Sequence, residues 1–283
     1  MLFRPLLSLL CLICAVGAIP THELVDRNLE KRINPSLAKF NRNLPGAPEQ
    51  MMRFLHAWTE VVLMMKIVHN QPDKELYNKV FAKWFNSGDL LYVEGVFSRL
   101  VGAENQADPG KPTGSDLLRH IKLVNEEHVH FPNDCVDKTV GAFIRSSDDG
   151  NSALLRICDL GWAQPLISEL DCDRVGDNVN ALMNTLPALI IHELTHWRQI
   201  GEPIIGAKIV DHGAAGYGPL NCRKIVGTSI APVVNADSYA WFANEYYWSI
   251  SCKKEYKDPT TNRNYGICPV DEDATGGAGC TVQ

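Results

Sequence analysis

Two histidines, four residues apart and with a glutamate directly after the first, lie at the end of an apolar segment. Residues 192–196 read His-Glu-Leu-Thr-His, and Leu189, Ile190 and Ile191 precede them. On a helix, positions i and i+4 share one face, so both imidazole rings can bind one ion. The alternative is an amphipathic helix with two histidines in the core. Because the preceding residues are apolar, we expect a buried helix that carries a metal-binding pair.

The glutamate of this motif is suited to a different task from the histidines. Glu193 lies about a hundred degrees round a helix from His192, beside a bound ion but not needed as a ligand. Bound zinc lowers the pKa of water to about 7, and a neighbouring carboxylate can remove the proton as the water attacks a carbonyl. We therefore predict one zinc ion per chain, held by His192 and His196, with Glu193 as the general base.

A catalytic zinc usually has three protein ligands and one open position. No third histidine follows the motif at short spacing, and no glutamate helix of the NExxxE kind follows it, so an aspartate is the natural third ligand. Asp211 and Asp237 are the two candidates, with His212 as a further competitor. Asp211 could instead be a loop residue that bonds within a turn. Asp237 could be a first-turn helix residue that the helix dipole stabilises.

Around these residues the chain resembles the aspzincin metalloendopeptidases, the fungal deuterolysin and peptidyl-lysine metalloendopeptidase group. The family pattern is HExxH, then G-T-x-D-x-x-Y-G, then a helix that bears N-A-D-[ST]-Y. This chain has Tyr217-Gly218 after its HExxH motif, and residues 235–239 read Asn-Ala-Asp-Ser-Tyr. The order and spacing match over residues 185–250. The resemblance implies a zincin-like fold and a zinc-dependent peptidase activity.

The resemblance also implies a third ligand. In the family this aspartate lies three residues before the tyrosine, where this chain has Ala214. Asp211 lies six residues before Tyr217, and a three-residue insertion such as residues 213–215 would restore the register. On this interpretation Asp211 is the third zinc ligand. Asp237 then lies close to the metal, either as an alternative ligand or as a residue that orients a ligand histidine.

Two further expectations come from the same resemblance. Tyr217 would stabilise the negative charge that develops on the substrate carbonyl oxygen. Members specific for lysine have a glutamate three residues after the Asn-Ala-Asp aspartate, and this chain has Ala240 there. Strict lysine specificity is therefore not expected, although Asp237 could still favour a basic side chain.

Hydrophobic periodicity predicts helices before the motif and a small β-hairpin between them. The expected helices are residues 48–69, 72–85 and 89–100, followed by a polar loop at 102–114. The expected strands are residues 140–145 and 153–157, on either side of a turn at 147–151. Helices, a hairpin and then helices predict an α+β fold, mostly helical, with a small hairpin or sheet beside the HExxH helix.

Near the motif, a helical pattern extends over residues 177–199. Pro187 is expected to break or restart it, with Thr185 as the N-cap. Gly201 and Pro203 are typical of a helix end. Residues 202–232 are expected to be mostly irregular, and residues 235–248 to form the last helix.

The N-terminal residues are typical of a secretory signal peptide. Arg4 precedes the apolar run of residues 6–18, which ends in small residues and is too short to cross a bilayer core of about 30 Å. The pair Lys31-Arg32 is a dibasic processing site that would make residues 19–32 a short propeptide. The metallopeptidase domain would then comprise residues 33–258, with a loosely structured tail at 259–283. We expect a secreted, extracellular protein.

Seven cysteines remain once residues 1–18 are removed, and secretion favours disulfides. By resemblance to the family, we expect a Cys135–Cys158 bond across the hairpin region. The next pairs that we predict are Cys222–Cys252 and Cys268–Cys280, which would leave Cys172 odd.

The overall charge argues against two classes of partner. With a formal net charge of −6, the chain has no electrostatic reason to bind nucleic acid or an anionic membrane. We predict a monomeric zinc endopeptidase that acts on protein or peptide substrates. The alternatives are a catalytically weak or inactive zincin-fold binding protein or effector, and a zinc scavenger. The displaced Asp211 favours the first of these alternatives, whereas Glu193 argues against both because a protein that only binds zinc needs no base.

Overall fold

The computed structural model describes residues 35–102, 114–126, 135–147 and 149–261. The expected signal peptide, propeptide and Cys268–Cys280 pair lie outside these residues. Most of the expected 102–114 loop and of the 259–283 tail also lie outside them. Within the described residues, no helix combines the length and the apolar character needed to span a bilayer.

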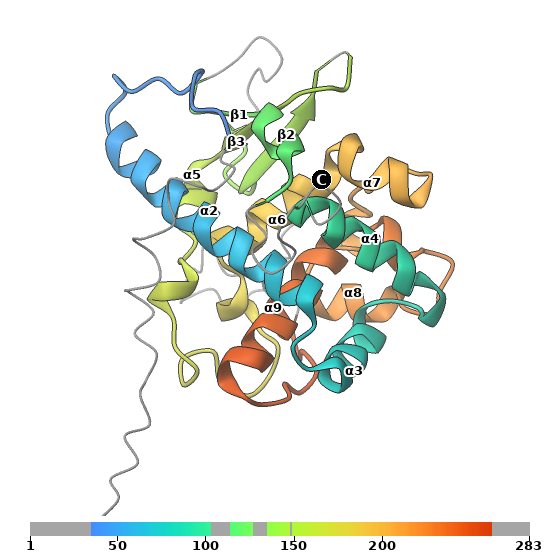
Figure 1. The fold of residues 1–283 in the computed structure, drawn as a ribbon. Coiled ribbons are helices and arrows are strands. Elements are labelled where there is room, and N and C mark those ends of the chain that lie inside the picture. Colours follow the sequence, from blue (N-terminus) through green and yellow to red (C-terminus); the bar gives the residue numbers. More distant parts are fainter. Residues whose placement is uncertain (1–34, 103–113, 127–134, 148, 262–283) are drawn as a thin grey trace, which may run out of the picture.

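The three helices predicted ahead of the motif are confirmed. They are α2 (Ala47–Asn70), α3 (Lys74–Trp84) and α4 (Leu90–Val101), each within two residues of its expected bounds. The Asp73 side chain caps α3, because its carboxylate accepts a hydrogen bond from the Leu76 N–H at 2.9 Å. α2 is the long helix on which α4, α6 and α9 pack (Figure 1).

The small sheet contains the predicted hairpin and one strand that was not predicted from the sequence. Strands β2 (Ala142–Ser146) and β3 (Ala153–Ile157) pair antiparallel, as expected. Strand β1 (Ile121–Val124) pairs parallel to β3 on its other side, so the order is β1-β3-β2 and β2 forms an edge. β1 has only four residues, too few for a clear alternation of apolar and polar side chains.

The second half of the chain is helical and contains the motif. It forms α5 (Asp159–Trp162), α6 (Leu186–His196), α7 (Arg198–Ile205), α8 (Pro219–Ile225) and α9 (Ala236–Cys252). The motif helix α6 packs against α2, α9 and β2 (Figure 1). The chain therefore has the predicted α+β class.

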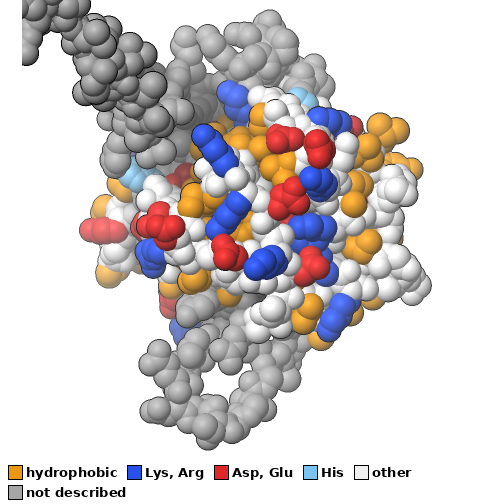
Figure 2. Space-filling view, turned by 90° about the horizontal axis from the view of Figure 1, so that it is seen from below, with side chains coloured by type: hydrophobic (Ala, Val, Ile, Leu, Met, Phe, Trp, Pro, Cys, Tyr) orange, Lys and Arg blue, Asp and Glu red, His pale blue; other side chains and the backbone are white. Residues whose placement is uncertain are grey.

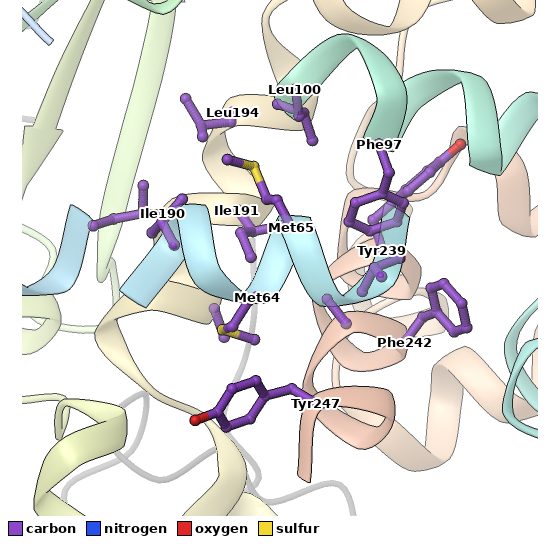
Figure 3. Close-up of a cluster of buried hydrophobic side chains, with 14 of the residues drawn as sticks. Met64, Met65, Phe97, Leu100, Ile190, Ile191, Leu194, Tyr239, Phe242 and Tyr247 are labelled. Atoms are coloured by element: carbon purple, nitrogen blue, oxygen red, sulfur yellow. The ribbon is translucent and has the colours of Figure 1, made fainter. Parts of the chain in front are cut away.

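The core around α6 joins four helices. Figure 3 shows two methionines of α2 between side chains of α4, α6 and α9. All of the labelled residues are buried: Met64, Met65, Phe97, Leu100, Ile190, Ile191, Leu194, Tyr239, Phe242 and Tyr247. Close packing of this kind leaves α6 little freedom to move relative to α9. The aromatic residues of α9 are thus mainly core.

Of the predicted helix at 177–199, the restart at Pro187 with Thr185 as the N-cap is confirmed, but the bounds at both ends were wrong. Before Thr185 the chain is irregular apart from the 3-10 turn η6 (Ala181–Met183), and α6 begins only where Thr185 accepts from the Ala188 N–H at 3.4 Å. The helix ends at His196, because Trp197 is in an extended conformation with ψ of 117°. A new helix, α7, then begins directly.

The predicted stop at Gly201 and Pro203 was also wrong, since α7 continues to Ile205. A proline within a helix leaves one carbonyl without its donor. That carbonyl belongs to Gln199, and it accepts a hydrogen bond from the Arg99 guanidinium of α4 instead. Gly201 has a packing role, because a Cβ there would lie 2.9 Å from the Ile209 side chain.

The region between α7 and α9, predicted to be mostly irregular, contains the short helix α8 and two 3-10 turns, η7 (Gly213–Ala215) and η8 (Pro232–Val234). The last helix begins one residue after its predicted start and extends four residues beyond its predicted end. The irregular prediction therefore holds only in part.

The disulfides correct one predicted pair. Cys135–Cys158 is present as expected, but Cys172 bonds to Cys252, and Cys222 is a buried free thiol. The predicted Cys222–Cys252 pair was wrong because Cys222 lies beside the first turn of α9, whereas Cys252 is the last residue of that helix. The Cys222 sulfur lies 4.0 Å from Asp237 in the first turn of α9, and Cys252 is about 22 Å further along the helix.

The Cys172–Cys252 bond should make a large contribution to stability. It joins residues 80 positions apart, and closing a loop of this size in the unfolded chain contributes about 2–5 kcal/mol. We expect the Cys172→Ser/Cys252→Ser variant to lose about that much free energy of unfolding in denaturant titrations. The buried Cys222→Ala variant is the matched control and should keep the stabilisation by this bond. Detection of a Cys222 disulfide in unreduced peptide maps would contradict the pairing.

Candidate metal centre

The two histidines of the motif point their Nε2 atoms at the same place. His192 and His196 are one turn apart on α6, and their Nε2 atoms lie 3.2 Å from each other. The rings are nearly perpendicular, with an interplanar angle of 80°. His192 is buried and His196 partly buried. The helix therefore presents two nitrogen donors at one point near the surface.

Asp211 completes a triangle with the two histidines. Its Oδ1 lies 3.2 Å from the Nε2 atom of His192 and 3.2 Å from that of His196. Two ligands of a tetrahedral ion, each about 2.0 Å from it, are about 3.3 Å apart. The three atoms thus have the spacing that a zinc-sized tetrahedral ion requires. The Asp211 side chain is 35% exposed, so this side of the group is open to solvent.

The hydrogen bonds behind the two rings set their tautomers. The Ile209 carbonyl lies 3.1 Å from Nδ1 of His196, and a carbonyl can only accept, so this nitrogen carries the proton. Nδ1 of His192 donates in the same way to Oδ1 of Asp237, at 2.9 Å. When the rings are neutral, both Nε2 atoms therefore direct a lone pair toward the centre of the triangle. This is how protein metal sites commonly orient their histidine ligands.

The charges of the group also suit a cation. Burial alone would lower the pKa of His192, but the carboxylates of Asp211 and Asp237 more than offset this and raise it. Burial would raise the pKa of Asp211, yet the two histidines hold it far below its usual range. The negative potential that retains a proton on these rings in the metal-free chain also attracts a divalent cation.

Backbone pairing holds Asp211 in place although it lies in a loop. The Val210 N–H donates to the Val234 carbonyl at 2.9 Å, and the Ala236 N–H donates to the Val210 carbonyl at 3.1 Å. The residue before Asp211 is therefore tied to the start of α9. Residues 213–215, which the family pattern lacks, form the turn η7 and do not separate Asp211 from Tyr217.

Asp237 lies behind His192 and is not one of the three converging groups. Its Oδ1 accepts from His192, and its Oδ2 accepts from the Gly218 N–H at 2.6 Å and from the Trp241 indole at 3.3 Å. Both carboxylate oxygens are thus engaged, and the side chain is buried. The structure separates the two candidate aspartates, because Asp211 lies at the Nε2 side of the His192 ring and Asp237 at its Nδ1 side. His212 is not part of the converging group.

Glu193 is buried next to the histidines but does not belong to the triangle. Burial raises the pKa of its carboxyl, and the nearby His192 and His196 offset only part of this effect. The backbone of Ile144, in the edge strand β2, also lies close enough to act on this carboxyl. A carboxylate with a raised pKa is a better proton acceptor than an exposed one.

Tyr217 also reaches the group. Its ring stacks along that of His192, with centroids 5.9 Å apart and an interplanar angle of 23°. Burial and the Asp211 carboxylate raise the pKa of Tyr217 far above its usual value, so the hydroxyl stays protonated and can donate a hydrogen bond. The structure thus brings Tyr217 beside Asp211.

Two groups that support the site were not predicted from the sequence to do so. Trp241 is a buried aromatic residue of α9, and its indole donates to Asp237. A signal existed, because Trp241 lies four residues after Asp237 and so shares its face of α9. The Ile209 carbonyl that orients His196 has no signal in the sequence, since every residue carries a backbone carbonyl.

The geometry predicts different effects for the two aspartates. Asp237→Asn should weaken zinc binding by roughly 10- to 100-fold, the usual effect of losing a residue that orients a ligand. Asp211→Ala should weaken it more, because one of three donor atoms is lost. Dissociation constants from chelator competition would measure both, with the exposed Asp159→Asn as the control. Stoichiometric zinc in Asp211→Ala together with a metal-free Asp237→Asn would reverse the assignment.

Comparison with known proteins adds no independent assignment. No family model matches this chain, and no curated protein sequence is significantly similar to it. The resemblance to the aspzincins therefore depends on the motif residues themselves.

Proposed function

We propose that this protein is a secreted zinc-dependent endopeptidase of the zincin-like type. The main support is the arrangement of His192, His196 and Asp211, whose donor atoms form a triangle with edges of 3.2 Å beside the buried carboxyl of Glu193. Two nitrogens and one carboxylate oxygen, with an open side, are typical donors of catalytic zinc. A structural zinc site would instead have four protein ligands and no open side.

Each nearby side chain has a distinct task in peptide hydrolysis. Zinc bound to these donors would act as a Lewis acid that polarises the substrate carbonyl and lowers the pKa of water. Glu193 takes the proton of the attacking water and transfers it to the amide nitrogen as the C–N bond breaks. Tyr217, held in its neutral form, donates a hydrogen bond to the negative charge that develops on the carbonyl oxygen.

The edge strand β2 favours a peptide over a small molecule as the substrate. β2 packs against α6, and the backbone of Ile144 lies next to Glu193. Among the described residues, β2 has a strand partner on one side only, β3. An extended peptide can add to such an edge through its main chain, which is independent of side-chain identity. A peptide bound there would have its carbonyl groups close to Glu193.

Two further observations support the proposed location and partners. The disulfides Cys135–Cys158 and Cys172–Cys252 are typical of proteins from an oxidising compartment. Figure 2 shows basic and acidic side chains interspersed over one face of the described residues. That face has no extended basic patch of the kind that binds nucleic acid.

The sharpest test of this function is Glu193→Gln. The amide cannot accept a proton, so cleavage of casein or a fluorogenic peptide should fall by about 10²- to 10⁴-fold. Zinc content should stay at one ion per chain, because Glu193 contributes no ligand atom. Glu202→Gln on α7 removes a carboxylate outside the site and should cleave like the wild type.

The same assay separates the alternative functions. A wild-type protein that holds zinc but cleaves neither casein nor a peptide library would be a binding protein or a zinc scavenger. Full activity of Glu193→Gln would contradict the role of this residue. Removal of zinc by a chelator should abolish cleavage, and added zinc should restore it.

A further inference from the structure

Asn235, the residue before α9, does not cap the helix with its side chain as an asparagine at this position usually does. It occupies the N-cap, where the side chain normally accepts a hydrogen bond from the first turn and contributes about 1 kcal/mol. In this structure the side chain makes no capping bond. Its Oδ1 is buried without a hydrogen-bond partner, and the residue is only 1% exposed. Stabilisation of α9 by capping therefore does not explain why an asparagine is buried at this position.

The amide of Asn235 is directed at the segment that carries Tyr217. Its Nδ2 donates to the Gly216 carbonyl at 3.0 Å and to the Ser238 hydroxyl at 3.0 Å. The Cys222 thiol donates to the same Gly216 carbonyl, at 2.9 Å. Two side chains thus converge on the carbonyl immediately before Tyr217.

The contact between Asn235 and Gly216 is also unusually close. A Cβ at Gly216 would lie 2.4 Å from Oδ1 of Asn235, so no residue other than glycine fits without displacing it. The φ angle of Gly216 is −106°, which any residue can adopt, so lack of space is the reason for glycine. On the other side of Tyr217, the Gly218 N–H is held by Asp237. Side-chain hydrogen bonds therefore hold the glycines on both sides of Tyr217 in place.

We propose that Asn235 is a positioning residue that holds the Tyr217 hydroxyl at the candidate metal centre through Gly216. The inference rests on the proposed function for the role of Tyr217 in turnover. The hydrogen bond that holds Gly216 does not depend on that role. The Asn235 side chain bonds to the tyrosine segment and to Ser238 but to neither histidine, whereas Asp237 bonds to both the tyrosine segment and His192. Loss of Asn235 should therefore affect turnover more than metal binding.

The test compares Asn235→Ala with Asn244→Ala. Asn244 is an equally buried asparagine on α9 whose amide has no hydrogen-bond partner among the described residues, so it is a matched control. Hydrogen exchange of the peptide covering residues 213–222 should be faster in Asn235→Ala and unchanged in Asn244→Ala. Asn235→Ser can still cap α9 but cannot reach Gly216. It should therefore fold at least as stably as Asn235→Ala and show the same faster exchange.

Measurement of kcat and KM for the same variants provides a second, independent test. In Asn235→Ala, kcat should fall by about 10-fold or more, with KM and zinc affinity nearly unchanged, because a contact made in the transition state is lost. Adding Tyr217→Phe should lower kcat less in Asn235→Ala than in the wild type, since both changes remove the same contact. In the Asn244→Ala background, Tyr217→Phe should lower kcat as much as it does in the wild type.

The two arms distinguish failure of this inference from failure of the proposed function. Unchanged exchange of residues 213–222 in both Asn235 variants would overturn the positioning role, whatever the activity. Additive effects of Asn235→Ala and Tyr217→Phe on kcat would overturn it as well. Faster exchange in a protein that cleaves no peptide would support the positioning role and reject the endopeptidase.

Discussion

The hydrogen bond from His192 to Asp237 joins the two helices on which the candidate site depends. It connects α6 to the first turn of α9, and the other oxygen of Asp237 holds the Gly218 N–H and the Trp241 indole. A buried carboxylate is costly unless its oxygens are partnered, so removing one partner affects the others. One side chain thereby orients a candidate ligand, anchors the tyrosine segment and contributes to the packing of α6 on α9.

The start of α9 also positions the remaining parts of the site. Val210 pairs with the backbone of Val234 and Ala236 and so fixes the loop that carries Asp211. Asn235 contacts Gly216, next to Tyr217. Beneath these contacts lies the core of Figure 3, in which α2, α4, α6 and α9 are closely packed. Side chains held in this way need little rearrangement when a ligand binds, which is the usual condition for a precise site.

Local patterns predicted most of the helices correctly, because an apolar stripe of helical period rarely fits a strand or a loop. The errors arose where a distant residue changed the local rule. Arg99 supplies the hydrogen bond that Pro203 cannot, so α7 does not stop there. Cys222 lies against the first turn of α9, so it cannot reach Cys252 at the other end. Strand β1 is too short to be recognised without its partner β3.

The relation of His192, Glu193 and His196 follows from the chain alone, because helix geometry sets the positions of residues i, i+1 and i+4. The roles of Asp211 and Asp237 do not. Both are acidic residues downstream of the motif, and nothing local distinguishes a ligand from the residue behind it. The distinction comes from the packing of α6 on α9 and the pairing of Val210 with the start of α9, which set the two carboxylates on opposite sides of one imidazole ring. Distances between segments far apart in the sequence are determined only when the chain folds.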